Sequence, residues 1–272
     1  MISAPVVSVT RLRELGERDN LKRGPTLKEA ERAGDWHGLL RLGRPSGRLC
    51  RRAISVWIMD RFNGLDVPES LEDALDPATL ALIVYDMQSG ILGQIADGDR
   101  VLANVLKLLA AARRRGIRTI FTRHYFMPTE LAGVYQLRQA KIWQRKNRAA
   151  ETRPLIPHGS AGFQLAEELR PGPGEAIIDK ITMSAFEGTP LDIVLRDCGV
   201  RAYLIAGVAI EVGVEPTVRH SADLGYIPIV VRDACGAGNQ SAGEWAMRSI
   251  AFAGDAFVVD TDDVRAILNS QR

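Results

Sequence analysis

Short apolar runs alternate with stretches in which apolar residues recur every three or four positions, from Pro77 almost to the end of the chain. Runs rich in β-branched and aliphatic residues, typical of buried strands, cover 80–85, 118–122, 176–178, 202–206, 227–231 and 256–259. Helical spacing covers 101–112, 191–198 and 214–222, and a last short helix is expected after Thr261. Near-continuous apolar strands separated by helices predict a parallel sheet covered on both faces, for which about 195 residues suffice.

The first 75 residues do not share this pattern and are predicted to be a separate N-terminal extension, followed by a single domain over 76–272. Between Thr10 and Arg52 there are twelve Lys or Arg and six Asp or Glu. The segment from Met59 resembles a natural chain start, so residues 1–58 are expected to be a misassigned or disordered extension with at most a short helix over 26–42. A transit peptide is the alternative, which the acidic residues disfavour.

Composition limits the function classes. Hydrophobic residues make up 46% and charged residues 25%, which are ordinary values for a globular protein, and no apolar run is long enough for a membrane span. The formal net charge of +2 gives no general attraction to nucleic acid. The three cysteines form neither a disulfide framework nor a zinc pattern, so we expect a cytoplasmic protein.

Chemistry-bearing residues follow the predicted strands, at the edge where open α/β sheets bind ligands. They are Asp86, Arg123, His124, Lys180, the segment 207–213 and Asp233. A converging Asp86 and Lys180 would form a coupled pair in which each charge favours the other. Each residue alone has a plainer interpretation, because a lone Asp often caps a turn and a lone Lys is usually solvated.

Three blocks resemble the isochorismatase-like hydrolase superfamily, in its order and spacing, over about residues 77–262. They read ALIVYDMQ, DKITMSAFEGTPLDIVL and YLIAGVAIEVGVEPTVRHSADLGYIPIVVRDAC. The resemblance implies a three-layer α/β/α sandwich with a six-stranded, mostly parallel sheet. It implies that Asp86 and Lys180 match two members of an Asp–Lys–Cys triad, that a non-proline cis peptide lies within 208–210, and that the chain forms a homo-oligomer.

Gly213 stands where superfamily members carry the nucleophilic cysteine, and none of the three cysteines can substitute. Isochorismatases of siderophore and phenazine pathways resemble the chain in having glycine there. That likeness implies vinyl-ether hydrolysis, in which Asp86 protonates the enol ether, water adds and pyruvate leaves. Lys180 would tune Asp86, and Gly213 would leave room for substrate and direct its N–H into the site.

Other residues of these blocks are candidates for contacts with a small substrate, and an anionic compound is one candidate. They are Gln88, Arg123, His124, Ala209, Ile210 and Glu211. Arg123 is a candidate partner for the carboxylate of Glu211, and Glu211 is itself a candidate base for water. No zinc-binding set is found, and no metal or cofactor is expected.

Three hypotheses remain open at this point. The first is a hydrolase that uses Asp86 and Lys180 without a covalent intermediate, with isochorismate-type vinyl ethers as candidate substrates. The second is a scaffold without catalysis that binds a partner through the basic extension and Trp36. The third is an amidase in which Glu211 activates water.

Overall fold

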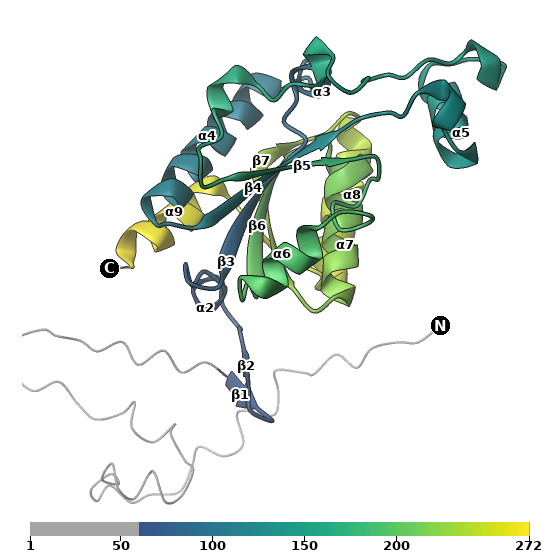
Figure 1. The fold of residues 1–272 in the computed structure, drawn as a ribbon. Coiled ribbons are helices and arrows are strands. Elements are labelled where there is room, and N and C mark those ends of the chain that lie inside the picture. The colour runs from purple at the N-terminus through teal and green to yellow at the C-terminus, as the bar shows by residue number, and fades with distance from the viewer. Residues whose placement is uncertain (1–59, 272) are drawn as a thin grey trace, which may run out of the picture. The chain divides into compact units, whose positions relative to one another are not determined.

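The structure, a computed structural model, describes residues 60–271, and a six-stranded parallel sheet lies at their centre (Figure 1). Its strand order is β5-β4-β3-β6-β7-β8. The strands are β3 (Leu80–Tyr85), β4 (Arg118–His124), β5 (Ala176–Lys180), β6 (Ala202–Val208), β7 (Ile227–Gly236) and β8 (Phe257–Val259). Each coincides with one of the six apolar runs, so the predicted sheet is confirmed.

Helices cover both faces of this sheet, which gives the three layers that were predicted (Figure 1). On one face, α4 (Gly98–Arg114) and α9 (Thr261–Ser270) pack on alternate strand residues such as Leu82 and Leu204. On the other face, α6 (Leu191–Asp197), α7 (Glu215–Asp223) and α8 (Gln240–Ala253) pack on residues such as Ile83 and Ile205. Strand β3 is buried along its whole length because it pairs with β4 and β6 and is covered on both faces.

Helix α8 was not predicted from the sequence. It begins at Asn239, whose side chain accepts a hydrogen bond from the backbone N–H of Ala242 at 3.0 Å. Trp245 and Phe252 on this helix are exposed, so its apolar residues do not follow one face. The mixed pattern hid a helix that nevertheless buries Ala246 and Ile250 against the sheet.

The stretch 125–160, for which the apolar pattern predicts no helix or strand, contains helix α5 (Val134–Trp143) and the short 3₁₀ helices η3 (Thr129–Leu131) and η4 (Ala149–Glu151). Its two ends meet, because the N–H of Phe126 donates to the carbonyl of Ile156 at 3.0 Å and a parallel bridge joins Phe126 to Pro157. In Figure 1 the segment between them carries α5 away from the sheet. The chain then returns through η5 (Ala161–Phe163) and η6 (Glu167–Leu169) to β5.

Structured elements begin before residue 76. An antiparallel hairpin joins β1 (Asp60–Phe62) to β2 (Leu65–Val67), and α2 (Leu71–Ala74) starts with a capping box between Ser70 and Asp73. The predictions for residues 1–59, including a helix over 26–42, lie outside the described residues.

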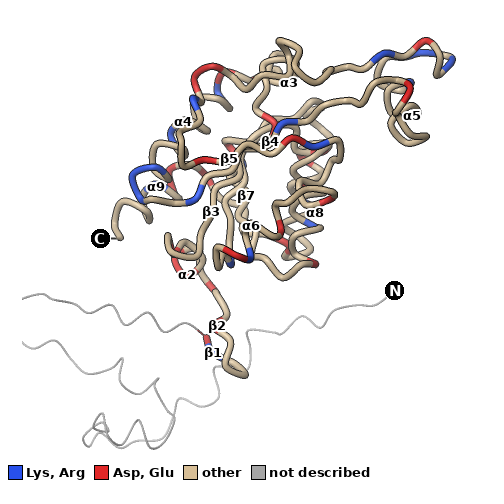
Figure 2. The backbone as a smooth tube through the Cα atoms, in the orientation of Figure 1, with Lys and Arg blue, Asp and Glu red and all other residues tan. Residues whose placement is uncertain are grey.

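Charged side chains of both signs are interspersed over loops and helices, whereas the two central strands β3 and β6 carry none (Figure 2). This distribution fits strands that are buried on both faces. Within 60–271, no helix is long and apolar enough to cross a bilayer.

Candidate active site at the carboxyl end of the sheet

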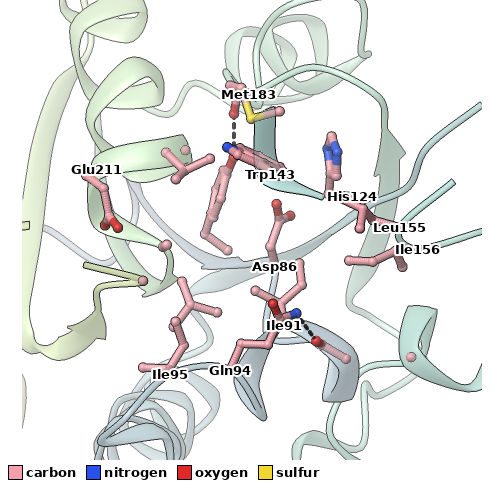
Figure 3. A pocket seen from close by; sticks show the side chains of 18 of the residues that line it. Asp86, Ile91, Gln94, Ile95, His124, Trp143, Leu155, Ile156, Met183 and Glu211 are labelled. Carbon is pink, nitrogen blue, oxygen red and sulfur yellow. Dashed lines mark hydrogen bonds between the residues drawn. The ribbon is translucent and has the colours of Figure 1, made fainter. Parts of the chain in front are cut away.

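A cavity of about 400 Å³ lies at the carboxyl ends of β3, β4 and β6 (Figure 3). Its walls are mainly apolar and include Ile91, Ile95, Phe126, Trp143, Leu155 and Ile156. The Asp86 carboxylate points into it between Glu211 on one side and His124 on the other. Among the described residues that line the cavity there is no Lys, Arg, Ser, Thr or Cys.

Asp86 and Lys180 converge as predicted. Lys180 Nζ lies 2.7 Å from Asp86 Oδ2, and the hydroxyl of Thr122 donates to Asp86 Oδ1 at 2.5 Å. Both members of the pair are buried. Burial lowers the pKa of Lys180, while the neighbouring charge of Asp86 opposes that shift. Each oxygen of the carboxylate therefore accepts a hydrogen bond from a buried side chain.

Tyr85 contacts Lys180 of this pair, although it was not predicted to be a site residue. Its hydroxyl accepts a hydrogen bond from Lys180 Nζ at 2.8 Å and donates one to the carbonyl of Met183. Burial raises the pKa of Tyr85 well above its usual value. The only signal in the sequence was a phenol directly before Asp86 in an otherwise aliphatic strand.

Gly213 lies beside the phenol of Tyr85. A Cβ atom at position 213 would lie 2.5 Å from Cε1 and Cζ of Tyr85 and closer still to its hydroxyl oxygen. The N–H of Gly213 donates to the carbonyl of Ala209 at 3.0 Å, so the expectation that it points freely into the site is wrong. It lies in the π-helical turn η7 (Ile210–Val214), which follows a cis peptide bond between Val208 and Ala209.

His124 ends β4 and lines the cavity with its ring edge-on to Phe126. The residue is buried, with an exposed fraction of 5%. Neither ring nitrogen has a hydrogen-bond partner among residues 60–271. Burial, with a smaller contribution from the charge of Lys180, lowers the pKa of His124 to about 4, so the ring is neutral at pH 7.

Gln88 does not line the cavity, contrary to the prediction that it contacts substrate. Its Oε1 accepts from the N–H of His124 at 2.6 Å, and its Nε2 donates to the carbonyls of His124 and Phe163 at 2.9 Å each. The fully buried amide therefore holds the end of β4 and the returning chain in place.

Arg123 also lies outside the cavity lining, so the predicted substrate contact and its pairing with Glu211 are not observed. It forms a two-point ion pair with Asp179, with N–O distances of 2.7 and 3.0 Å, and its guanidinium lies 4.2 Å over the ring of Phe163. Asp233 caps the start of α9 by accepting from the N–H of Thr261 at 2.8 Å.

The segment 209–211 is split between cavity and core. Ala209 lines the cavity, whereas Ile210 packs into the core and does not reach it. Glu211 lines the cavity, but its Oε1 accepts from the N–H of Asn239 at 2.7 Å. Its carboxylate therefore fixes the chain just before α8.

The two cysteines of the described part, Cys198 and Cys235, do not line the cavity. Burial raises the pKa of Cys235 to about 12, so its thiol stays protonated at neutral pH. In residues 60–271 no three His, Cys, Asp or Glu side chains are grouped so that they could hold a metal ion.

Comparison with known proteins identifies a family for the part of the chain that contains the sheet and the cavity. The isochorismatase domain model matches residues 80–263. The chain belongs to the isochorismatase family of hydrolases. Residues 80–263 include Asp86, Lys180 and Gly213, so the residues that converge in the structure fall within the region that defines the family.

Among curated relatives, the ureidoacrylate amidohydrolase RutB of Pseudomonas syringae pv. syringae is 32% identical over 204 residues, covering 68% of this chain and 80% of the relative. RutB of Methylobacterium radiotolerans is 34% identical over 191 residues, covering 64% and 74%. An isochorismatase family protein from Burkholderia thailandensis is a structural neighbour with a TM-score of 0.60, 27% identity, and coverage of 72% and 98%. A cysteine hydrolase from Pseudomonas syringae pv. phaseolicola has a TM-score of 0.63 at 23% identity, covering 72% and 95%.

Proposed function

We propose that this hydrolase cleaves the C–N bond of a small, uncharged carbamoyl or amide compound, with a water molecule activated by Asp86. The observation that carries the proposal is a carboxylate held by Lys180 and Thr122 in an apolar cavity whose described lining offers no Ser, Thr or Cys nucleophile. The bond class is supported by the relatives that are named ureidoacrylate amidohydrolases.

Asp86 acts as the base in this scheme. Its carboxylate takes a proton from water, and the water oxygen forms a bond to the carbonyl carbon of the substrate. The tetrahedral intermediate then breaks its C–N bond, and the proton held by Asp86 moves to the departing nitrogen. Lys180 holds the carboxylate in place at 2.7 Å and balances its charge. The reaction consumes one water and needs no covalent intermediate.

His124 is the donor that the substrate oxygen would meet. Its neutral ring carries one N–H, faces the cavity and has no partner in the described chain. A fixed donor in a dry site stabilises the negative charge that develops on the carbonyl oxygen. This role replaces the one expected for the N–H of Gly213, which is already donated to Ala209.

The charged side chains that line the cavity favour an uncharged substrate. Asp86 and Glu211 line the cavity, and none of the described lining residues is Lys or Arg. A substrate carboxylate would be buried there without a cation, which is unfavourable. An isochorismate-type vinyl ether carries such carboxylates, and its hydrolysis needs a proton on Asp86, whose two oxygens already accept hydrogen bonds from Lys180 and Thr122.

The test is a substrate panel with purified full-length protein. Benzylurea and benzamide represent uncharged carbamoyl and amide compounds, ureidoacrylate an anionic one, and isochorismate the vinyl ethers. Mass spectrometry follows amine, ammonia and pyruvate release. We expect turnover of benzylurea or benzamide, lowered about 100-fold or more in Asp86→Asn, as for loss of a general base.

Asp179→Asn is the matched control, since Asp179 is a carboxylate at the same edge of the sheet but outside the cavity. It should retain turnover. Pyruvate release from isochorismate without turnover of the ureas or amides would replace the proposal by vinyl-ether hydrolysis. Amide turnover that is unchanged in Asp86→Asn and lost in Glu211→Gln would move the base to Glu211. No turnover of any compound would favour the scaffold hypothesis.

A further inference from the structure

We infer that Tyr85 is a positioning residue for the Asp86–Lys180 pair, and that glycine at position 213 provides the space for its phenol. The kinetic part of this inference rests on the proposed function, and the structural part does not. Tyr85 belongs to β3 and Gly213 to η7, so the arrangement joins two segments that are far apart in the sequence.

The ammonium of Lys180 has three acceptors. They are Asp86 Oδ2 at 2.7 Å, Tyr85 Oη at 2.8 Å and the carbonyl of Thr182 at 3.1 Å. An ammonium has three N–H donors, so this set satisfies all of them. The Lys180 side chain is fully buried, and no solvent can replace a lost acceptor without rearrangement.

The phenol of Tyr85 is fixed in both directions. Its oxygen accepts from Lys180, and its proton is donated to the carbonyl of Met183. Lys180 Nζ also lies 4.3 Å from the centroid of the Tyr85 ring, within the range of a cation–π interaction. Because the phenol remains protonated and its proton is in use, Tyr85 acts through Lys180 and not as a nucleophile.

Gly213 and Tyr85 are sterically complementary. A Cβ atom at 213 would approach two phenol carbons to 2.5 Å, well inside van der Waals contact, and no flexible chain end is available to move away. Any side chain at 213 would therefore push the phenol away from Lys180. The absence of a side chain at Gly213 thus leaves space for the phenol of Tyr85. The prediction from the sequence was that this space would hold substrate.

Few other charged groups face Lys180. Asp86 follows β3, and His124 is its register partner on β4, with a neutral ring. Gly213 of η7 and Thr217 of α7, which lie on the far side of the phenol, are uncharged. The adjacent register pair, Arg123 and Asp179, binds together on the opposite face of the sheet. The hydroxyl of Tyr85 is therefore, beside Asp86, the one other side-chain group among the described residues that accepts a hydrogen bond from Lys180.

The first test needs no substrate. The full chain is labelled with ¹⁵N-lysine, the Lys180 ammonium is assigned by its loss in Lys180→Met, and its titration is followed by NMR. Tyr85→Phe removes an acceptor of Lys180, together with the donor to the carbonyl of Met183, so the Lys180 pKa should fall by about one unit. Tyr203→Phe is the matched control, because Tyr203 is equally buried but its hydroxyl contacts Ser221 at 2.6 Å.

An unchanged Lys180 titration in Tyr85→Phe, or an equal shift in Tyr203→Phe, would overturn the inference. Gly213→Ala provides a second route should Tyr85→Phe not fold. Displacement of the phenol should lower the Lys180 pKa in the same direction, and a titration like that of the wild type would count against the inference.

The second test is kinetic and uses any compound that the panel shows to be turned over. Tyr85→Phe should lower kcat about tenfold with KM nearly unchanged, and the alkaline limb of the pH profile should move to lower pH with the Lys180 titration. A rise in KM alone would overturn the positioning role. Failure of every compound would remove the proposed function, and the NMR titration would still decide the role of Tyr85.

Discussion

The buried neutral His124 makes the stability of the fold depend on pH. Unfolded histidine takes up a proton near pH 6.5, whereas His124 in the folded protein does so only near pH 4. Its pKa is therefore lower in the folded state than in the unfolded state. The stabilisation is fully present above about pH 6.5 and is lost progressively as the pH falls toward 4.

Linkage between these two pKa values gives the magnitude. At pH 7.5 the His124 side chain is almost unprotonated in both the folded and the unfolded state. Its titration therefore does not lower the free energy of unfolding at this pH. At pH 5 the unfolded state is mostly protonated and the folded state is not, which costs about 2 kcal/mol. Near pH 4 the loss reaches about 3 kcal/mol.

Urea unfolding at pH 7.5 and pH 5 measures this loss. His124→Leu removes the titrating group and should show a loss about 2 kcal/mol smaller than the wild type. An equal loss in His124→Leu and the wild type would refute the assignment of His124 as a buried neutral group.

Three further predictions concern contacts around the site and are tested by urea unfolding, with KM measured in addition for the third. Gly213→Ala should lower the free energy of unfolding by about 3 kcal/mol through overpacking, whereas Gly174→Ala, whose Cβ meets nothing within 4 Å, should change it little, and equal effects would contradict the clash. Gln88→Leu should cost about 3 kcal/mol, because it strands a buried N–H and two carbonyls, and a neutral result would show that these groups find other partners. A double-mutant cycle on Arg123→Met and Asp179→Asn should give a coupling of about 1 kcal/mol with no change in KM, and a raised KM would place Arg123 in contact with substrate.

The inner strands β3, β4, β6 and β7 were predictable because they are largely buried, which leaves a continuous apolar run such as Leu80–Tyr85. Strand β7 extends beyond its apolar run to Gly236, because its pairing with β6 resumes at Cys235 and Gly236 after an irregularity in register that includes Arg232 and Asp233. Helix α8 was missed for the opposite reason. Its exposed Trp245 and Phe252 disturb the apolar period on which recognition of a helix depends.

Parallel strands place their carboxyl ends together, so Asp86 and Lys180 could be brought to one site from the sequence alone. Contacts that depend on side-chain direction could not be predicted in this way. Arg123 and His124 are neighbours on β4, yet one faces Asp179 and the other faces the cavity. Tyr85 was indistinguishable from a core residue until its distance to Lys180 and its contact with Gly213 were known.

The two ends of the segment 127–156 are held together by contacts at its base. Changes in this segment can therefore be considered separately from changes at Asp86 and Lys180. Phe126 meets Ile156 and Pro157 at the base of the segment, and Trp143 and Leu155, within it, line the cavity wall. A change in loop length between pinned ends costs only about 0.6 kcal/mol for each doubling. The wall can therefore be exchanged, by evolution or by grafting, while Asp86 and Lys180 stay where the sheet holds them. Substrate range and bond-breaking chemistry become independently adjustable parts of one chain.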